Sequence, residues 1–438
     1  MAGVPDDSLV PLGPWPEGID NVHSETDLPT NDKGRIVALR EAVNVDINDG
    51  GKVSSREGYN KAVSCTRGHS LWHDGLFPYC LFVDDGTLFA TNFSDQIALV
   101  SDLASLPVSY RLVNERVYWS NGHQNGVIYP DLTTTPWGVE TPLGQPTLTT
   151  NGIALPPGKY QVAVTFRSTS GEESGASIAV QIDVGPGQGF DLSHIPQPIA
   201  PNIIAVRLHM SPTNGDALYF ARDLPVGMTS ATLGQLPSGI PLATQFLEPM
   251  APGQIVEYLG GRMYVFAGNV MMWSEALRYG LMHPTKNRMR IGSHITMAVA
   301  VGEGTDGAGL YVSDGVRTYW FSGPDPAQFT RKIAYSFAAI PGTQTTIAGS
   351  FFGLETAQPV AYWIAENGVA CLGLPGGVVT PLRESQVVAP NAESGATALI
   401  ERNGMRQAIT ALQGTAPRQF GVTDQVAATV YRNGVEIP

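Results

Sequence analysis

The sequence is built around one recurring unit, in which an apolar strand enters a tight turn, usually Asn-Gly or Asp-Gly, and a second apolar strand follows. Glycine supplies the positive φ that a two-residue hairpin turn requires, and Asn or Asp tolerates the same backbone region. Leu310 and Val312 before one turn, and Thr318 and Trp320 after it, alternate as half-buried strands do. Because such hairpins must pair into antiparallel sheets, we expect an all-β fold. The units occupy residues 81–90, 117–129, 263–273, 310–321, 362–373, 400–409 and 430–437.

The spacing of these turns restricts the choice among all-β folds. Outside one long gap, the steps between turn glycines run from 36 residues (86 to 122) to 53 residues (315 to 368). Repeats of about 40–50 residues, each a small antiparallel sheet, indicate a β-propeller, here of about six blades. The alternative is an irregular β-sandwich or barrel with hairpins at chance spacing. The turn glycines are Gly86, Gly122 or Gly126, Gly268, Gly315, Gly368 and Gly404.

The long gap holds a different kind of segment. Residues 160–166 alternate at Tyr160, Val162, Val164 and Phe166, and a second alternating run covers 178–184. Further strand candidates lie at 203–210 and 217–221, and about seven short strands fit an inserted β-sandwich of immunoglobulin or fibronectin type. Proline and glycine near positions 142 and 252 suggest its limits. We therefore expect residues 1–142 and 251–438 to form one propeller, interrupted by a sandwich at 143–250.

A propeller has to close its ring, often by pairing a strand from one end of the chain with strands from the other. Residues 38–59 predict a hairpin, because Val43, Val45 and Ile47 alternate before Asp49-Gly50-Gly51. Residues 43–59 and 430–437 are the natural candidates for this closure.

Composition excludes several classes of protein. The formal net charge is −13 and only 15% of residues are charged, so wrapping of DNA or of an anionic membrane is not expected. Cys65, Cys80 and Cys371 are too few for a disulfide framework or a cysteine zinc site, and we expect three reduced, buried thiols. No signal peptide or membrane span is expected, since the longest uncharged stretches, 224–247 and 333–354, contain prolines and glycines.

Two motifs come close to ligand-binding patterns. Asp46-x-Asn48-x-Gly50-Gly51-x5-Glu57 resembles a calcium loop, but Gly50 offers no side-chain oxygen at the fifth position and the flanks predict strands. A plain hairpin is the favoured interpretation of Asp46 to Glu57, and a weak calcium site stays open. Gly302-x-Gly304-x-x-Gly307 has dinucleotide-fingerprint spacing, but strands are predicted on both sides where a helix should follow, so a turn is expected.

The remaining polar clusters do not form a catalytic set. Ser313, Asp314 and Gly315 are adjacent, which departs from the spacing of a sialidase Asp-box. His69 and His73 are four residues apart beside glycines and have no third ligand, and the pairs Asp84-Asp85 and Glu172-Glu173 are expected to be solvated turn residues. Lys286, Arg288 and Arg290 form a small basic cluster, either a solvated face or one side of a contact with an acidic neighbouring subunit. We expect no catalytic, cofactor-binding or metal-binding residues, and no cofactor.

Three stretches resemble the tail hub or nozzle proteins of short-tailed bacteriophages, a family also called phage stabilisation proteins. They are residues 18–21 with 38–59, which carry Ala42, Asn44, Val45, Asp46, Arg56, Gly58 and Tyr59; residues 155–180; and residues 271–282 with 310–330. The resemblance implies a β-propeller with inserted domains, assembled as a six-fold ring beneath the portal and adaptor that extends the DNA-ejection channel.

On that basis we expect a non-enzymatic structural virion protein, a head-to-tail connector component made in the host cytoplasm and located in the virion tail. Its expected partners are its own copies in a homohexamer, adaptor or portal proteins, tail fibres or spikes, and a plug or needle, with DNA passing unbound and no membrane insertion. A ring carrying 6 × −13 = −78 formal charges would repel phosphates. The alternatives are a carbohydrate-active β-propeller enzyme and a glycan-binding module.

Overall fold

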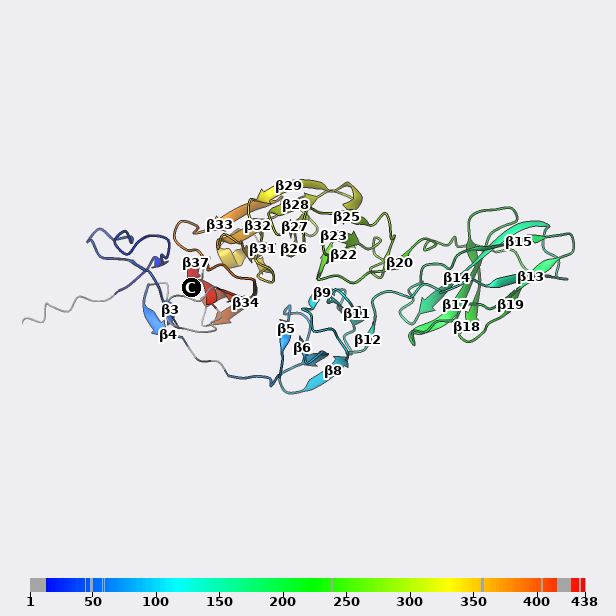
Figure 1. The fold of residues 1–438 in the computed structure, drawn as a ribbon, viewed down its shortest axis with the longest axis horizontal. Helices are drawn as coiled ribbons and strands as arrows, with labels where there is room; N and C mark the ends of the chain where they lie inside the picture. The colour runs from blue at the N-terminus through cyan, green and yellow to red at the C-terminus, as the bar shows by residue number, and fades with distance from the viewer. Residues whose placement is uncertain are drawn as a thin grey trace, which may run out of the picture. The chain divides into compact units, whose positions relative to one another are not determined.

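The computed structural model describes residues 13–43, 45–47, 50–56, 58, 60–237, 239–355, 358–402, 405–415, 427–432 and 435–437. In these residues the regular structure is β-strand, with two short 3₁₀ turns, η2 (Pro326–Gln328) and η3 (Gly349–Phe352), and no α-helix. The all-β expectation is confirmed (Figure 1). The chain forms two compact units, residues 65–290 and residues 1–64 with 291–438.

The first unit, residues 65–290, contains three four-stranded antiparallel meanders among its described residues. The first has the order β5 (His69–Trp72), β6 (Cys80–Asp84), β7 (Thr87–Thr91) and β8 (Gln96–Val100). The second is β12 (Thr134–Pro136), β11 (Asn125–Ile128), β10 (Arg116–Ser120) and β9 (Ser109–Val113). The third is β21 (Ile255–Leu259), β22 (Arg262–Ala267), β23 (Val270–Trp273) and β25 (Arg288–Arg290).

The second unit also contains three four-stranded meanders in its described part. They are β26 (Met297–Val301), β27 (Gly309–Ser313), β28 (Thr318–Ser322) and β29 (Thr330–Tyr335); then β30 (Thr345–Ala348), β31 (Pro359–Ile364), β32 (Ala370–Leu374) and β33 (Val378–Leu382). The last is β34 (Ser394–Arg402), β35 (Met405–Gln413), β36 (Ala427–Arg432) and β37 (Val435–Ile437).

The turn chemistry explains most of these hairpins. Asp85 and Gly86 both have positive φ, +49° and +77°, as a type I′ turn between β6 and β7 requires. Of the two glycines considered for the next hairpin, Gly122 lies in the turn, whereas Gly126 lies in β11 against the indole of Trp119. Gly404 lies outside the described residues.

Within each unit the meanders pack face to face. On β10, Val117 and Trp119 join one hydrophobic core, while Tyr118 between them joins another. On β31, Tyr362 and Trp363 likewise point into two different cores. Because successive strand side chains point to opposite faces, both of these sheets are buried on both sides. Sheets are thus stacked within each unit.

Residues 139–233 form a body with its own core (green in Figure 1). One sheet has the order β13 (Thr147–Asn151), β16 (Gly189–Ser193) and β19 (Ala231–Leu233). The other has the order β15 (Val180–Val184), β14 (Gly158–Ser168), β17 (Ile203–Met210) and β18 (Tyr219–Pro225). The alternation predicted for 160–166 is confirmed, since all four apolar residues lie in the core; Ile178 is 77% exposed and precedes β15.

The chain ends contact each other differently from the expected strand pairing. β1 (Gly18–Ile19) pairs with β2 (Ala38–Leu39), and β3 (Val45–Ile47) pairs with β4 (Val53–Ser55), whereas the described strands of the last sheet all come from 394–437. β1 contacts β37 without pairing with it in a sheet, and the side-chain amide of Asn21 exchanges hydrogen bonds of 2.9 Å with the backbone of Val388. A small core of Ile19, Ile47 and Ile409 adds to this contact.

The cysteines depart in part from what the composition predicts. The three cysteines are unpaired, but Cys65 is exposed and Cys80 half-buried, so the expectation of three buried thiols holds only for Cys371. Cys65 lies in the loop before β5, outside any core.

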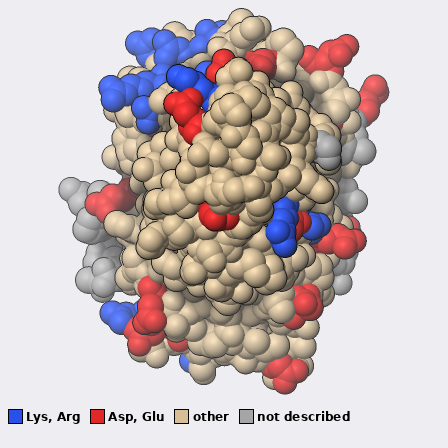
Figure 2. Space-filling model, turned by 90° about the vertical axis from the view of Figure 1, so that its right-hand side faces the viewer, with Lys and Arg blue, Asp and Glu red and all other residues tan. Residues whose placement is uncertain are grey.

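Uncharged residues cover most of the face seen in Figure 2, and acidic side chains are scattered on it. No helix in the described part of the chain could span a bilayer.

Candidate functional site

Hydrogen bonds and a shared core hold the junction where residues 143–250 leave and rejoin the meanders. Both connecting segments lie on the loop between β23 and β25. The indole Nε1 of Trp137 donates to the carbonyl of Tyr279 at 2.8 Å, and the Met250 amide donates to the carbonyl of Gly280 at 2.9 Å. β20 (Glu248–Pro249) and β24 (Leu281–Met282) pair beside them.

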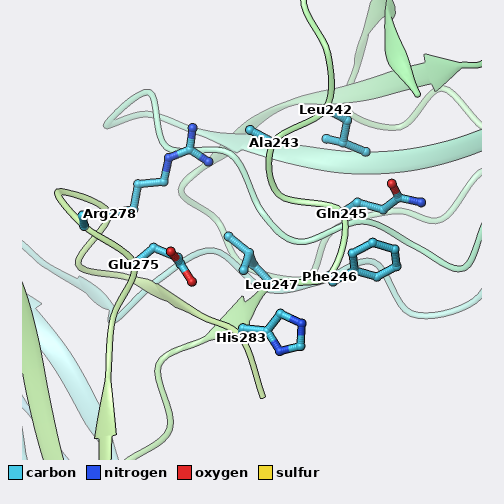
Figure 3. A pocket seen from close by; sticks show the side chains of 9 residues that line it. Leu242, Ala243, Gln245, Phe246, Leu247, Glu275, Arg278 and His283 are labelled. Carbon is cyan, nitrogen blue, oxygen red and sulfur yellow. The ribbon is translucent and has the colours of Figure 1, made fainter. Parts of the chain in front are cut away.

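A pocket of about 440 Å³ opens at this junction (Figure 3). One wall is the segment before β20, which presents Leu242, Phe246 and Leu247, and the other wall is the loop that carries β24. The volume is within the range of ligand pockets, and the lining combines apolar and charged groups. The lining residues are Leu242, Ala243, Gln245, Phe246, Leu247, Glu275, Ala276, Arg278 and His283.

Two polar side chains of this pocket, Glu275 and His283, are held by neighbouring residues. Glu275 accepts a hydrogen bond of 2.8 Å from the Asn287 amide and lies 4.0 Å from the guanidinium of Arg262. His283 uses Nδ1 to accept the backbone amide of Thr285 at 3.3 Å. Since no serine or cysteine lines the pocket, this arrangement provides no nucleophile with an adjacent base.

Glu172 forms a second contact between the body of residues 139–233 and the β9–β12 sheet. It shares a small cavity with Arg116, Tyr118 and Tyr129, and the Arg116 guanidinium lies 5.0 Å from the centre of the Tyr129 ring. Burial raises the pKa of Glu172, and the charge of Arg116 and a hydrogen bond from Ser170 oppose only part of that rise. The expectation that Glu172 is solvated is wrong, because its loop packs on this sheet.

Glu173 faces another way and completes a polar network on the outer side of β14 and β17. Its Oε1 accepts from Thr165 at 2.7 Å and contacts His209 Nε2 at 2.8 Å, while its Oε2 lies 3.3 Å from Arg207. Arg207 in turn pairs with Asp223 at 2.8 Å. The solvation expected for Glu173 is therefore also wrong. Burial favours a raised pKa at Glu173, but the hydrogen bonds from His209 and Thr165 outweigh it and lower the pKa.

This network does not have the geometry of a catalytic triad. Thr165 and Glu173 both contact the same nitrogen, Nε2 of His209, whereas a triad places its acid on the other ring nitrogen. His209 Nδ1 is buried and has no hydrogen-bond partner among the described residues. Among the described residues no group of His, Cys, Asp and Glu could hold a metal ion.

The motifs singled out by sequence serve backbone geometry. Gly302, with a φ of +74°, begins a turn between β26 and β27, as expected. Asp314 is 3% exposed, and its carboxylate accepts the amides of Val316 and Arg317 at 3.1 and 3.0 Å. Its role is to close the turn after β27.

The remaining candidates do not converge on one site. Asp46 lies on β3 next to Arg56 at 3.6 Å, and the other side-chain positions of the calcium-like motif, Asn48 and Glu57, lie outside the described residues. His69 bonds the Ser70 hydroxyl at 2.8 Å, and His73 contacts the Phe77 carbonyl at 2.9 Å, which matches two independent histidines.

The charged turn and the basic cluster are on the surface. Asp84 accepts the amide of Arg67 at 2.7 Å, and Asp85 pairs with the Arg67 guanidinium. Lys286, Arg288 and Arg290 are exposed, the latter two on β25. Sequence reasoning missed the junction pocket, because its two walls are set by contacts as distant as Trp137 with Tyr279.

Comparison with known proteins identifies no family. No protein-family model and no curated protein matches the chain. Among solved structures, a chain from a crystal structure of BBS1N in complex with ARL6DN matches with 10% identity and a TM-score of 0.33, covering 83% of this chain and 97% of that chain. The N-terminal domain of Nup159 matches with 10% identity and a TM-score of 0.27, covering 78% and 72%. These scores are too low to carry an argument.

Proposed function

We propose that this chain is a structural protein of a short-tailed bacteriophage virion, the hub or nozzle that forms a homohexameric ring below the portal and adaptor. The observation that carries the proposal is the order of the parts. Along the chain, four-stranded meanders come both before and after a two-sheet body that has its own core. The sequence resemblance implies this order. The meanders act as the blades of a discontinuous propeller of about six blades, residues 1–142 and 251–438.

The inserted body, residues 143–250, is proposed to be an immunoglobulin-like sandwich. The order β15-β14-β17-β18 corresponds to strands C′-C-F-G of that fold, and the β13–β16 pair corresponds to strands B and E. The strand order departs from the fold at one edge, where β19 pairs with β16. This body is proposed to contact fibres, spikes or a plug, as the sequence resemblance implies.

The proposed role is mechanical and electrostatic, with no chemical step. A net charge of −13 on each copy makes a ring that repels the phosphates of passing DNA, which keeps the duplex mobile in the channel. The low content of charged residues, 15%, suits large contacts between subunits. Adaptor and portal proteins are the proposed neighbours at one end of the ring.

The test is to purify virions of the phage that encodes the chain, and to measure protein stoichiometry by quantitative mass spectrometry. The proposal predicts six copies for each portal ring, and gold-labelled antibody at the tail. Absence of the chain from purified virions would overturn it.

A glycan-binding module is the second candidate, favoured by one observation. The junction pocket is lined by Glu275, Arg278 and His283 and by Phe246, whose ring lies near His283 in Figure 3, and a lining of polar groups with an aromatic face also suits a sugar. Binding of the isolated chain to a glycan array, lost in Phe246→Ser, would favour this function over the ring.

A further inference from the structure

The loop and strand that follow the junction pocket are unusually basic for this chain. From 276 to 302 the sequence has no carboxylate, but it has four cations between 278 and 290. Arg278, Lys286, Arg288 and Arg290 are all exposed, and none takes part in an ion pair with another described residue. Their positive charge is therefore available to something outside the chain.

An apolar surface adjoins these cations. Phe246 is 68% exposed at the pocket, and Leu277, which precedes the pocket residue Arg278 in the chain, is 76% exposed. The cations are continuous with the pocket, because Asn287, between Lys286 and Arg288, bonds the pocket residue Glu275 at 2.8 Å. We call Phe246, Leu277, Arg278, Lys286, Arg288 and Arg290 the junction face. An apolar centre with a charged rim is the composition of a protein–protein interface.

We propose that the junction face binds an acidic surface of a second copy of this chain, and so forms the contact between neighbouring subunits. The charge distribution selects this occupant. Apart from these four cations, each copy has 26 − 4 = 22 Lys and Arg residues and 39 Asp and Glu residues. The rest of each copy therefore carries a formal charge of −17. A neighbouring copy thus supplies the complementary charge, and electrostatic complementarity fixes orientation in such contacts. This inference rests on the proposed ring.

A nucleic acid is the less suitable occupant. Nucleic-acid sites track phosphates with many cations, whereas this face offers four cations beside exposed apolar side chains that contribute nothing to phosphate binding. The remaining surface of an acidic chain would also repel a duplex.

The test compares three full-length proteins by native mass spectrometry and sedimentation velocity, with and without the adaptor complex. They are the wild type, Arg288→Glu/Arg290→Glu, and the control Lys159→Glu/Arg222→Glu, whose residues are exposed on β14 and β18 and change the net charge equally. The junction-face variant is expected to need at least about tenfold more protein to assemble, because attraction becomes repulsion. Rising salt should weaken wild-type assembly.

Each possible result supports or overturns the proposed contact between copies. Assembly of the junction-face variant at the wild-type concentration overturns this inference but leaves the proposed ring standing. A wild type that stays monomeric with the adaptor overturns both. Tight binding of a fluorescent 30-base-pair duplex, lost only in the junction-face variant, assigns the face to nucleic acid and overturns the self-contact. Equal weakening in the control variant overturns it too, since net charge alone then accounts for the effect.

Discussion

Gly138 and Gly144 provide a matched pair for testing whether the junction holds the inserted body rigidly. Both have a left-handed backbone, with φ of +92° and +91°. A Cβ added at Gly138 would lie 2.3 Å from the carbonyl oxygen of Gly280, whereas one added at Gly144 meets nothing within 4 Å. Alanine therefore imposes the same backbone penalty at both sites and a steric overlap at only one.

The expected magnitudes follow from these two terms. The left-handed backbone costs alanine about 1–2 kcal/mol at either position. Overpacking against Gly280, whose position is held by the Met250 amide, adds about 1–3 kcal/mol to Gly138→Ala alone. Since 1.4 kcal/mol corresponds to a factor of ten, local opening at the junction should be roughly 5- to 150-fold more frequent than in Gly144→Ala.

Hydrogen exchange measured by mass spectrometry on the full chain reports this opening directly. The peptide containing the Met250 amide, which donates to Gly280, should exchange faster in Gly138→Ala and near the wild-type rate in Gly144→Ala. A peptide from β31 serves as an internal control. Equal exchange in the two variants would refute the rigid junction, because the overlap with Gly280 would then have been relieved without cost.

Three further predictions concern partly buried polar groups. Glu172 has a raised pKa in the folded protein, so its negative charge destabilises the fold once the pH rises above the pKa of the unfolded chain. Glu172→Gln should therefore raise the thermal midpoint more at pH 7.5 than at pH 4.5. Glu173 has a lowered pKa, so the charged carboxylate stabilises the folded protein above the unfolded pKa, and this stabilisation is lost on acidification. Glu173→Gln should lower the free energy of unfolding by about 1–3 kcal/mol at pH 7, because it leaves His209 poorly paired. Denaturant titration should show a smaller loss at low pH. Asn21→Ala should lower the free energy of unfolding by about 1–2 kcal/mol, because it removes the hydrogen bonds to Val388. It should also speed proteolysis of the N-terminal segment, and an unchanged cleavage rate would contradict this role of Asn21.

Local chemistry explains what could be predicted from the sequence. The alternation through Val162 and Val164 predicts the strand β14, and Asp85-Gly86 predicts the turn between β6 and β7, because both depend on neighbouring residues alone. The turn between β9 and β10 was not signalled by glycine, since Asn114 and Glu115 adopt φ of +50° and +63° themselves. Tertiary pairing selects that conformation.

The site could not be predicted in the same way. Glu172 has the sequence context of a solvated turn, and only the packing of its loop on Arg116 buries it. The junction pocket depends on the register in which Met250 meets Gly280, which no local pattern encodes. The calcium-like motif was expected to form a plain hairpin, and Asp46 lies in the hairpin strand β3 beside Arg56.

Native mass spectrometry of the chain at tens of micromolar, alone and with a portal–adaptor complex, tests the central claim most directly. A homohexamer has a mass of 6 × 46.6, or about 280 kDa, and the account predicts this species in at least the adaptor-containing sample. A chain that stays at 46.6 kDa and never adds to the adaptor contradicts the ring, and with it the proposed place of this protein in the tail.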